Sequence, residues 1–223
     1  MSNKELREIR GAVEALGFLP VQIAATVKKQ NLWYKHSELR DSIDKYLFLA
    51  HKPKAQAYSI HVGVVGRNAH ARVIAALDGI KEFVAPIYLA DSFYIERPCW
   101  HMFDAGRALN WNSVYVIPNP YNPSNWRERF DELVNKFLTK EILEISSERK
   151  IIDLLLRNDA PFEWSLTNSV LRVAEVVAMA KVSELSVGEL MSKLSLLQKD
   201  ITRGLYGSKS YAKAMDAIVE LLY

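Results

Sequence analysis

The stretch "YSIHVGVVGRNAHARVIAALDG", Tyr58 to Gly79, decides the fold class of this chain. In its first half an apolar residue recurs at every second position, which is the period of a β-strand: Tyr58, Ile60, Val62 and Val64. The strand ends at Gly66, and Asn68 can then cap a helix that runs to about Leu77. The stretch therefore predicts a strand, a tight turn and a helix.

A glycine turn between a strand and a helix is also how a dinucleotide-binding loop begins. Such a loop needs three glycines in the pattern G-x-G-x-x-G, because each has a steric role against the pyrophosphate. Here Gly63 and Gly66 are three positions apart and the third glycine is missing. One feature fits such a loop, because Asp91 follows Gly66 at about the sequence separation at which an acid would bind a ribose. We therefore predict a plain turn and no cofactor; a parallel sheet with both glycines at its carboxyl edge would favour a nucleotide.

The residues before Tyr58 predict an antiparallel meander. Two β-rich runs, "LWYK" at 32–35 and "IDKYLFLAHK" at 43–52, are joined to the next strand by a turn at Pro53. Strands this close in sequence leave no room for crossover helices, so neighbouring strands should be antiparallel. A helix from Ser2, its predicted cap, to Leu16 should precede them and stop at Gly17.

The second half of the chain has the period of helices. Further strands are expected in "FVAPIYLA" and "SVYVI", and three prolines in "PNPYNP" then mark a break. Beyond it, apolar residues recur at helical spacing. The predicted fold class is α+β, with an antiparallel β-meander and flanking helices in the N-terminal half and a helical bundle in the C-terminal half. We predict subdomains at residues 1–122 and 123–223.

Composition is that of an ordinary globular protein. The chain has 223 residues, of which 49% are hydrophobic and 25% charged, enough for a core without disulfides or a metal. Cys99 is the single cysteine, so no internal disulfide can form and a reducing cytosol is expected. The sequence has no signal-peptide pattern and no apolar run long enough for a membrane helix, so we expect a cytoplasmic protein with no membrane partner.

Basic residues concentrate in the N-terminal half. Between Val21 and Arg72 nine basic and three acidic residues give a charge of +6, whereas fourteen basic and fifteen acidic residues from Tyr121 to Tyr223 give −1. A local positive charge favours an acidic partner, either protein or nucleic acid. The alternative is that these lysines line the edge and solvent face of the sheet.

Aromatic residues interleave with this basic stretch: Trp33, Tyr34, Tyr46, Phe48 and Tyr58. Such a mixture can bind single-stranded nucleic acid or anchor a protein interface, and it can equally form the core of a meander. Where charge and aromatic residues coincide we place the candidate partner-binding residues: Lys28, Lys29, Trp33, Lys35 and Arg40.

Cys99 and His101 are the strongest candidates for catalysis or metal binding. Two positions apart on a strand, they would share one face. A nucleophilic cysteine needs a base and a zinc site needs two more ligands, for which His51, His61 and His70 are the candidates nearest in sequence. Free cysteines are usually buried, so we favour a packed cysteine beside a hydrogen-bonded histidine, and predict neither a catalytic residue nor a metal.

The segment "LSVGELMSKLSLLQKDITRGLYG", Leu185 to Gly207, resembles the helix-turn-helix of bacterial winged-helix regulators. Ser186 would cap the first helix, and Leu190 and Leu194 would face inward. The resemblance implies that the second helix presents Gln198, Lys199, Thr202 and Arg203 to the major groove. The segment departs from that pattern at Met191 and Ser195, and a helix stands where a wing is expected. The alternative is an αα-hairpin in a bundle.

The first hundred residues resemble a bacterial α+β family of unknown function whose members are found near polymorphic toxins. The resemblance rests on a leading helix that ends at Gly17-Phe18, on "NLWYK" and on "IHVGV". It implies an immunity-like protein and assigns no catalytic residue. We therefore predict a non-catalytic protein-interaction module, and the resemblance implies a toxin-immunity or inhibitor-like protein whose partner is a toxin or another protein with an acidic surface. The alternative is a nucleic-acid-binding protein that uses the helix-turn-helix-like segment or the basic N-terminal meander.

Overall fold

The computed structural model describes residues 3–21, 32–37, 42–52, 54, 57–84, 102–104, 109, 115–117, 126–156, 169–195 and 211–223. Its strands are β1 (Phe18–Val21), β2 (Leu32–His36), β3 (Ile43–Lys52), β4 (Ala57–Gly66), β5 (Met102–Asp104) and β6 (Tyr115–Ile117). Its helices are α1 (Asn3–Ala15), α2 (Arg67–Ile80), the 3-10 turn η2 (Lys81–Phe83), α6 (Trp126–Leu133), the π-helix η3 (Val134–Leu143), α7 (Glu148–Leu156), α8 (Ser169–Val182), α9 (Val187–Ser195) and α11 (Tyr211–Leu222).

The strands form one antiparallel sheet in the order β1-β2-β3-β4-β5, and β6 also pairs with β4. The long hairpin β3–β4 is its centre, with Leu47 opposite Val62 and Leu49 opposite Ile60. The predicted meander and α+β class are therefore confirmed. Because every described pair is antiparallel, the parallel sheet that a dinucleotide site at Gly66 would require is absent from this part of the chain.

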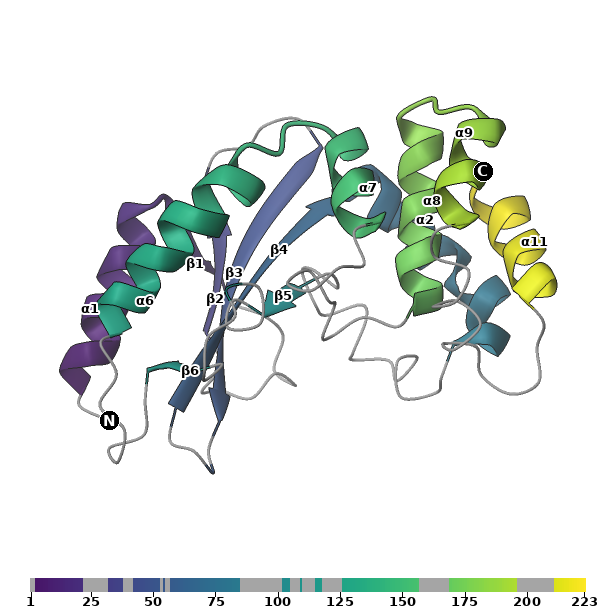
Figure 1. The fold of residues 1–223 in the computed structure, drawn as a ribbon. Coiled ribbons are helices and arrows are strands. Elements are labelled where there is room, and N and C mark those ends of the chain that lie inside the picture. The colour runs from purple at the N-terminus through teal and green to yellow at the C-terminus, as the bar shows by residue number, and fades with distance from the viewer. Residues whose placement is uncertain are drawn as a thin grey trace.

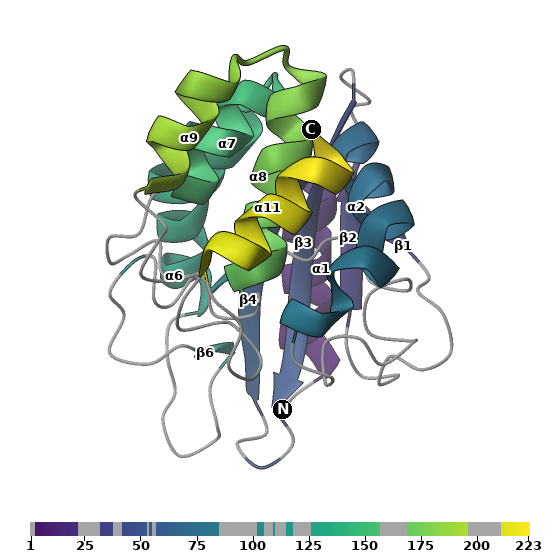
Figure 2. The same ribbon diagram turned by 90° about the vertical axis from the view of Figure 1, so that its right-hand side faces the viewer.

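Helices cover one face of the sheet and one of its ends. α1 and the continuous helix α6–η3 lie on the same face, while α2, α7, α8, α9 and α11 gather at the end where β4 runs into α2 (Figures 1 and 2). The apolar residues of the covered face alternate as the sequence predicts, and Leu47, Leu49 and Ile60 are fully buried. Helical packing at the end of the sheet places α2 against both α8 and α11.

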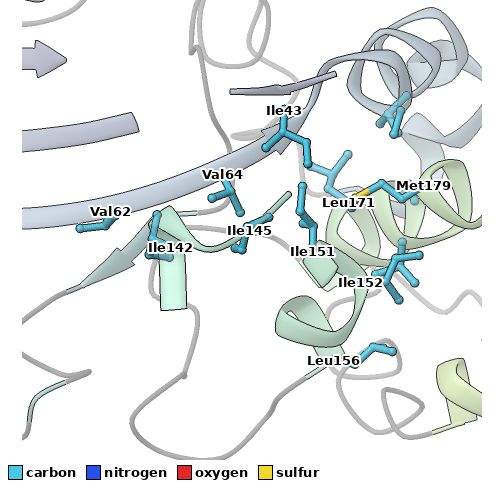
Figure 3. Packing of buried hydrophobic residues seen from close by; sticks show 14 of the residues in the cluster. Ile43, Val62, Val64, Ile142, Ile145, Ile151, Ile152, Leu156, Leu171 and Met179 are labelled. Carbon is cyan, nitrogen blue, oxygen red and sulfur yellow. The ribbon is translucent and has the colours of Figure 1, made fainter. Parts of the chain in front are cut away.

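One hydrophobic core joins the sheet to the helices. Ile43, Val62 and Val64 of the strands belong to the same buried cluster as Ile151 of α7 and Leu171 of α8 (Figure 3). Residues on both sides of position 122 thus share this core. The division into subdomains 1–122 and 123–223 stays a prediction.

Two local features differ from the simple helical pattern. Helix α2 begins at Arg67 with Gly66 as its N-cap and no side-chain cap hydrogen bond, so the predicted cap at Asn68 is wrong. Downstream of α6, residues Val134–Leu143 form a π-helix. Its wider turn buries Leu133, Leu138 and Ile142, which are five and four positions apart in the sequence. The stop at Gly17 is confirmed, since its φ of 84° is in the left-handed region that glycine tolerates.

Candidate functional site

Of the five predicted partner-binding residues, the structure describes Trp33 and Lys35; Lys28, Lys29 and Arg40 lie outside the described residues. Trp33 is only 5% exposed, and its ring stacks on Phe48 with 4.1 Å between the ring centroids. It belongs to a second small cluster, on the face of the sheet opposite α1, with Tyr46, Ala50 and Val65. The ring of Trp33 is therefore used in packing, and its role in binding a partner stays a prediction.

Lys35 is partly exposed and pairs with an acid of the next strand. Its Nζ lies 2.8 Å from Oδ2 of Asp44, and Nε of Arg67 lies 3.8 Å from the other oxygen of the same carboxylate. Asp44 itself is buried. Two basic residues of the N-terminal half thus share the one acid that the described part of residues 42–72 contains.

The charged side chains of residues 42–72 that reach the surface all have the same sign. Lys52 and Lys54 are exposed at the β3–β4 turn, and Arg67 and Arg72 are exposed on α2. Lys45 is buried instead, and its Nζ donates to the carbonyl oxygen of Leu143 at 2.5 Å. Among the described residues from 42 to 72, every exposed charged side chain is therefore a cation.

A buried serine and histidine lie next to each other on β4. Oγ of Ser59 is 3.0 Å from Nε2 of His61, and the backbone partner of His61 on β5 is Asp104. These residue types can form a nucleophilic triad. Ser59 is fully buried and His61 almost so, and the ring of Phe48 stands against the imidazole. We interpret the pair as a hydrogen bond within the sheet. Its spacing of two residues on a strand was the signal available in the sequence.

The turn from β4 into α2 contains a carboxylate from elsewhere in the chain. Glu148, in the first turn of α7, accepts hydrogen bonds from the backbone N–H of Ala69 and from the side chain of Ser42. Ala69 is the third residue of α2, so Glu148 supplies the cap that Asn68 does not. A Cβ at Gly66 would stand 2.6 Å from Oε1 of Glu148. The helix N-terminus, where a phosphate would bind in a nucleotide loop, is occupied by this side chain.

A second polar contact lies one residue along α2. Nδ1 of His70 is 2.8 Å from Oε1 of Glu175 on α8, and Glu175 is 1% exposed. Arg172, one turn earlier on α8, is buried as well. Sequence reasoning treated His70 as a metal candidate and did not single out Glu148 or Glu175, because acids in helices are usually solvated.

The first helix of the helix-turn-helix-like segment is α9. Ser186 and Glu189 form a reciprocal capping box, with Glu189 N–H donating to Ser186 Oγ at 3.3 Å and Ser186 N–H donating to Glu189 Oε2 at 3.1 Å. The predicted cap and the burial of Leu190 and Leu194 are confirmed. Met191, where the motif has a small residue, is 42% exposed.

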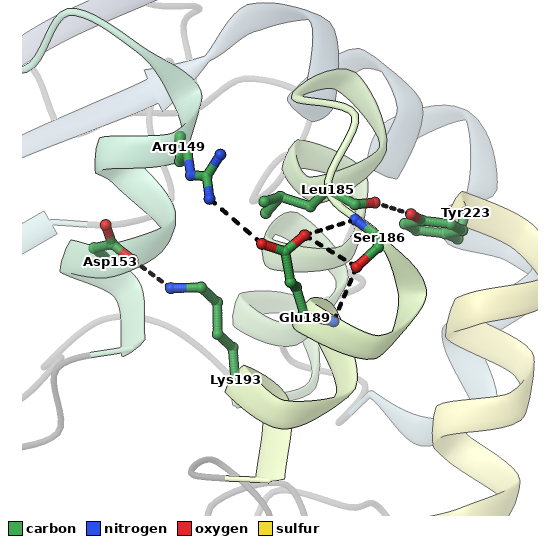
Figure 4. Close-up of polar contacts among 7 residues, drawn as sticks. All are labelled: Arg149, Asp153, Leu185, Ser186, Glu189, Lys193 and Tyr223. Carbon is green, nitrogen blue, oxygen red and sulfur yellow. Dashed lines mark hydrogen bonds and ion pairs between the residues drawn. The ribbon is translucent and has the colours of Figure 1, made fainter.

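Charged contacts fasten α9 to its neighbours (Figure 4). Lys193 pairs with Asp153 of α7 at 2.7 Å, and Arg149 pairs with Glu189 at 3.6 Å. The hydroxyl of Tyr223 donates to the carbonyl of Leu185 at the start of the same turn. α9 is thus packed as a member of the bundle. The proposed major-groove residues Gln198, Lys199, Thr202 and Arg203 lie outside the described residues.

The remaining candidates can be placed only in part. Cys99 and His101 fall outside the described residues, and the ring of His51 lies 5.0 Å from that of Tyr58. Within the described ranges, no three His, Cys, Asp or Glu side chains are grouped so that they could hold a metal ion. In the same part of the chain, no helix has both the length and the apolar character needed to cross a membrane.

Comparison with known proteins found no match for this chain, whether among protein-family models, curated proteins or solved structures. The resemblances to a toxin-associated family and to a helix-turn-helix therefore stay predictions.

Proposed function

We propose that this chain is a non-catalytic interaction module that binds a protein partner through an acidic surface of that partner, in a toxin-immunity or inhibitor-like role. The observation that carries the proposal is the uniform sign of the exposed charges among the described residues from 42 to 72, which end in the second turn of α2. We call Lys52, Lys54, Arg67 and Arg72 the cationic set. Lys52 and Lys54 lie at one end of the β3–β4 hairpin, and Arg67 and Arg72 lie at the other. Charges of one sign steer an oppositely charged partner toward the protein and discriminate against partners of the same sign.

The burial of the aromatic residues favours a protein partner over single-stranded nucleic acid. Proteins that bind single strands combine a positive groove with exposed rings on which the bases stack. The rings of the basic stretch that could stack are all buried: Trp33, Tyr34, Tyr46, Phe48 and Tyr58. Within the described residues of the basic stretch, the positive charge thus reaches the surface while the aromatic rings do not.

Among the described residues, the polar side chains that we considered for catalysis have structural partners. Ser59 and His61 bond to each other inside the sheet, and His70 bonds to Glu175 between two helices. Glu148 caps α2. These contacts support a binding role. The single cysteine of the sequence, Cys99, supports a reducing cytosol as the setting.

Retention of a partner by the immobilised chain, from lysate treated with nuclease, tests the proposal. The variant Lys52→Gln/Lys54→Gln/Arg67→Gln/Arg72→Gln removes the cationic set. A matched control, Arg7→Gln/Arg10→Gln/Lys136→Gln/Lys140→Gln, removes four exposed cations from α1 and η3. We expect the first variant to lose an acidic protein that the parent and the control retain and that salt elutes.

A titration with labelled nucleic acid, carried out beside the retention experiment, tests the alternative of nucleic-acid binding. Cations also attract phosphates, and each lost phosphate contact lowers the salt dependence of binding by about one unit. Labelled duplex and single strands are therefore titrated against the parent and against Lys199→Ala/Arg203→Ala. The proposal would be contradicted if the parent retained no acidic protein but bound duplex, and if the Lys199→Ala/Arg203→Ala variant lost that duplex binding. This outcome would support the helix-turn-helix.

A further inference from the structure

Three parts of the chain meet at the corner where β4 becomes α2. Ser42 stands just before β3, Gly66 ends β4 and Ala69 lies in the first turn of α2. Glu148 reaches this corner from α7, and Glu175 reaches α2 from α8, two helices that also pack on each other. We call these residues, together with His70, the α2 corner. In Figure 1, α7 and α8 stand beside the end of β4 where α2 begins.

Glu148 is enclosed at the α2 corner with half of its carboxyl group unpaired. The residue is 5% exposed, and its Oε1 has no hydrogen-bond partner, so the bonds from Ser42 and Ala69 go to the other oxygen. Oε1 lies over Gly66, where not even a Cβ would fit. A buried, unbonded carboxylate oxygen is costly if it carries charge.

Glu175 has a matching unpaired oxygen. Its Oε1 bonds to His70, whereas its Oε2 is buried without a partner. Coulombic repulsion from Glu175 adds to the effect of burial in raising the pKa of Glu148. A proton on Glu148 removes this repulsion and the cost of burying a second charge.

Other charged groups face the corner from the elements packed around it. Asp44, at the start of β3, is paired with Lys35 and Arg67. His70 faces Glu175 from α2, and Arg172 is buried one turn before Glu175 on α8. Burial is the largest influence on the carboxyl group of Glu148, followed by its hydrogen bonds from Ser42 and Ala69 and then by Glu175.

We propose that the α2 corner is a proton-operated clamp, in which Glu148 holds a proton while α7 is docked on the first turn of α2 and releases it when α7 moves away. This inference is independent of the cationic set and of any partner. It concerns how firmly the helices that follow Glu148 stay joined to the sheet.

The sign of the pH dependence follows from the direction of the shift. Burial raises the pKa of Glu148 above its ordinary value of 4.5, against which the bonds from Ser42 and Ala69 act. The closed state of the clamp therefore has its full stability relative to the open state at pH values below the ordinary pKa, where both states are protonated. It weakens as the pH rises from there through the raised pKa, because the open state ionises first. Over that interval the ratio of closed to open molecules falls about tenfold for each pH unit.

Carboxyl carbon NMR of the full chain and amide hydrogen exchange test the clamp. The first follows the protonation of Glu148. The second follows the amides of Ala69 and His70, corrected for the intrinsic pH dependence of exchange. We expect Glu148 to titrate above its ordinary value of 4.5, and exchange at both amides to speed up about tenfold for each pH unit over the same interval.

Variants separate the clamp from other causes. Glu148→Gln keeps an acceptor for Ala69 and cannot ionise, so its exchange should not respond to pH over that interval, whereas Glu144→Gln should behave as the parent. Since His70 also faces Glu175, Glu175→Gln provides a second measurement, and it should lower the pKa of Glu148 by removing the like charge. Titration of Glu148 at or below its ordinary value, or an unchanged pH response in Glu148→Gln, would overturn the proposal.

Discussion

The ammonium group of Lys45 lies 2.5 Å from the carbonyl oxygen of Leu143, although 98 residues separate the two in sequence. Leu143 is the last residue of the π-helix η3, whose final carbonyls have no partner within the helix. A cation at this end also opposes the partial negative charge of the helix dipole. A buried lysine of the sheet thus caps a helix of the second half.

Replacing Lys45 with Met tests this cap, because Met preserves the apolar stem and removes the donor. We expect a loss of about 1–3 kcal/mol in the free energy of unfolding, the cost of leaving a buried acceptor unsatisfied. Urea denaturation measures it. Lys52→Met, at the exposed end of the same strand, should change little, and equal stability of the two variants would show that Lys45 has no capping role.

Gly66→Ala should destabilise the chain by about 1–3 kcal/mol, because the new Cβ meets the side chain of Glu148. Its backbone angles, φ −80° and ψ 109°, suit alanine, so the cost is steric. In a Glu148→Ala background the same change should cost less. Gly188→Ala is the control, since nothing lies within 4 Å of a Cβ there and a helical alanine stabilises. A penalty that persists without the Glu148 side chain would contradict this assignment.

Ser186→Ala should remove the capping box of α9 and lower the free energy of unfolding by about 0.5–2 kcal/mol. The bonds from the backbone and the side chain of Ser186 lower the pKa of Glu189, so in the variant that pKa should move back toward the ordinary value. Because the pKa of Glu189 is lowered in the folded chain, these bonds stabilise the fold at pH values above the ordinary pKa of a glutamate. That stabilisation is lost as the pH falls through the lowered pKa. Ser192→Ala, on the exposed side of the same helix, should leave both the stability and the titration of Glu189 unchanged.

The contact of His70 with Glu175 should show favourable coupling in a double-mutant cycle of His70→Ala and Glu175→Gln. We expect chemical denaturation to give a coupling energy between about 0.5 and 3 kcal/mol, because the side chain of Glu175 is fully buried and that of His70 is largely buried. The exposed pair of Lys81 and Asp78 provides the comparison, and its cycle should give almost nothing. Additive losses at His70 and Glu175 would mean that the two side chains stabilise the fold separately.

Sequence reasoning succeeded where the physical cause is local. The alternation on β4 predicts a strand because side chains point to opposite faces at every step. The closeness of β3 and β4 in sequence requires an antiparallel pair. Gly17 and Ser186 end or begin helices through bonds to residues within a few positions, so their roles are visible in the sequence.

Expectations about the surface were less successful, because they depend on what the rest of the chain covers. Alternation puts Trp33 on the face opposite Tyr34, and both residues are buried. Lys45 was counted with the basic surface, although its period on β3 is that of Leu47 and Leu49. The pattern assigns a face to a residue, and its solvent exposure is set by the elements that pack there.

By itself, the sequence determined the α+β class, the antiparallel meander, the end of α1 and the start of α9, since these depend on the period of apolar residues, on turns and on local caps. Only the tertiary structure decided which polar residues meet: Lys45 with Leu143, Glu148 with Ala69, and His70 with Glu175. The physical reason is that a charged residue gives the same local pattern whether it is solvated or buried. Its partner is chosen by packing between segments that are far apart in the chain.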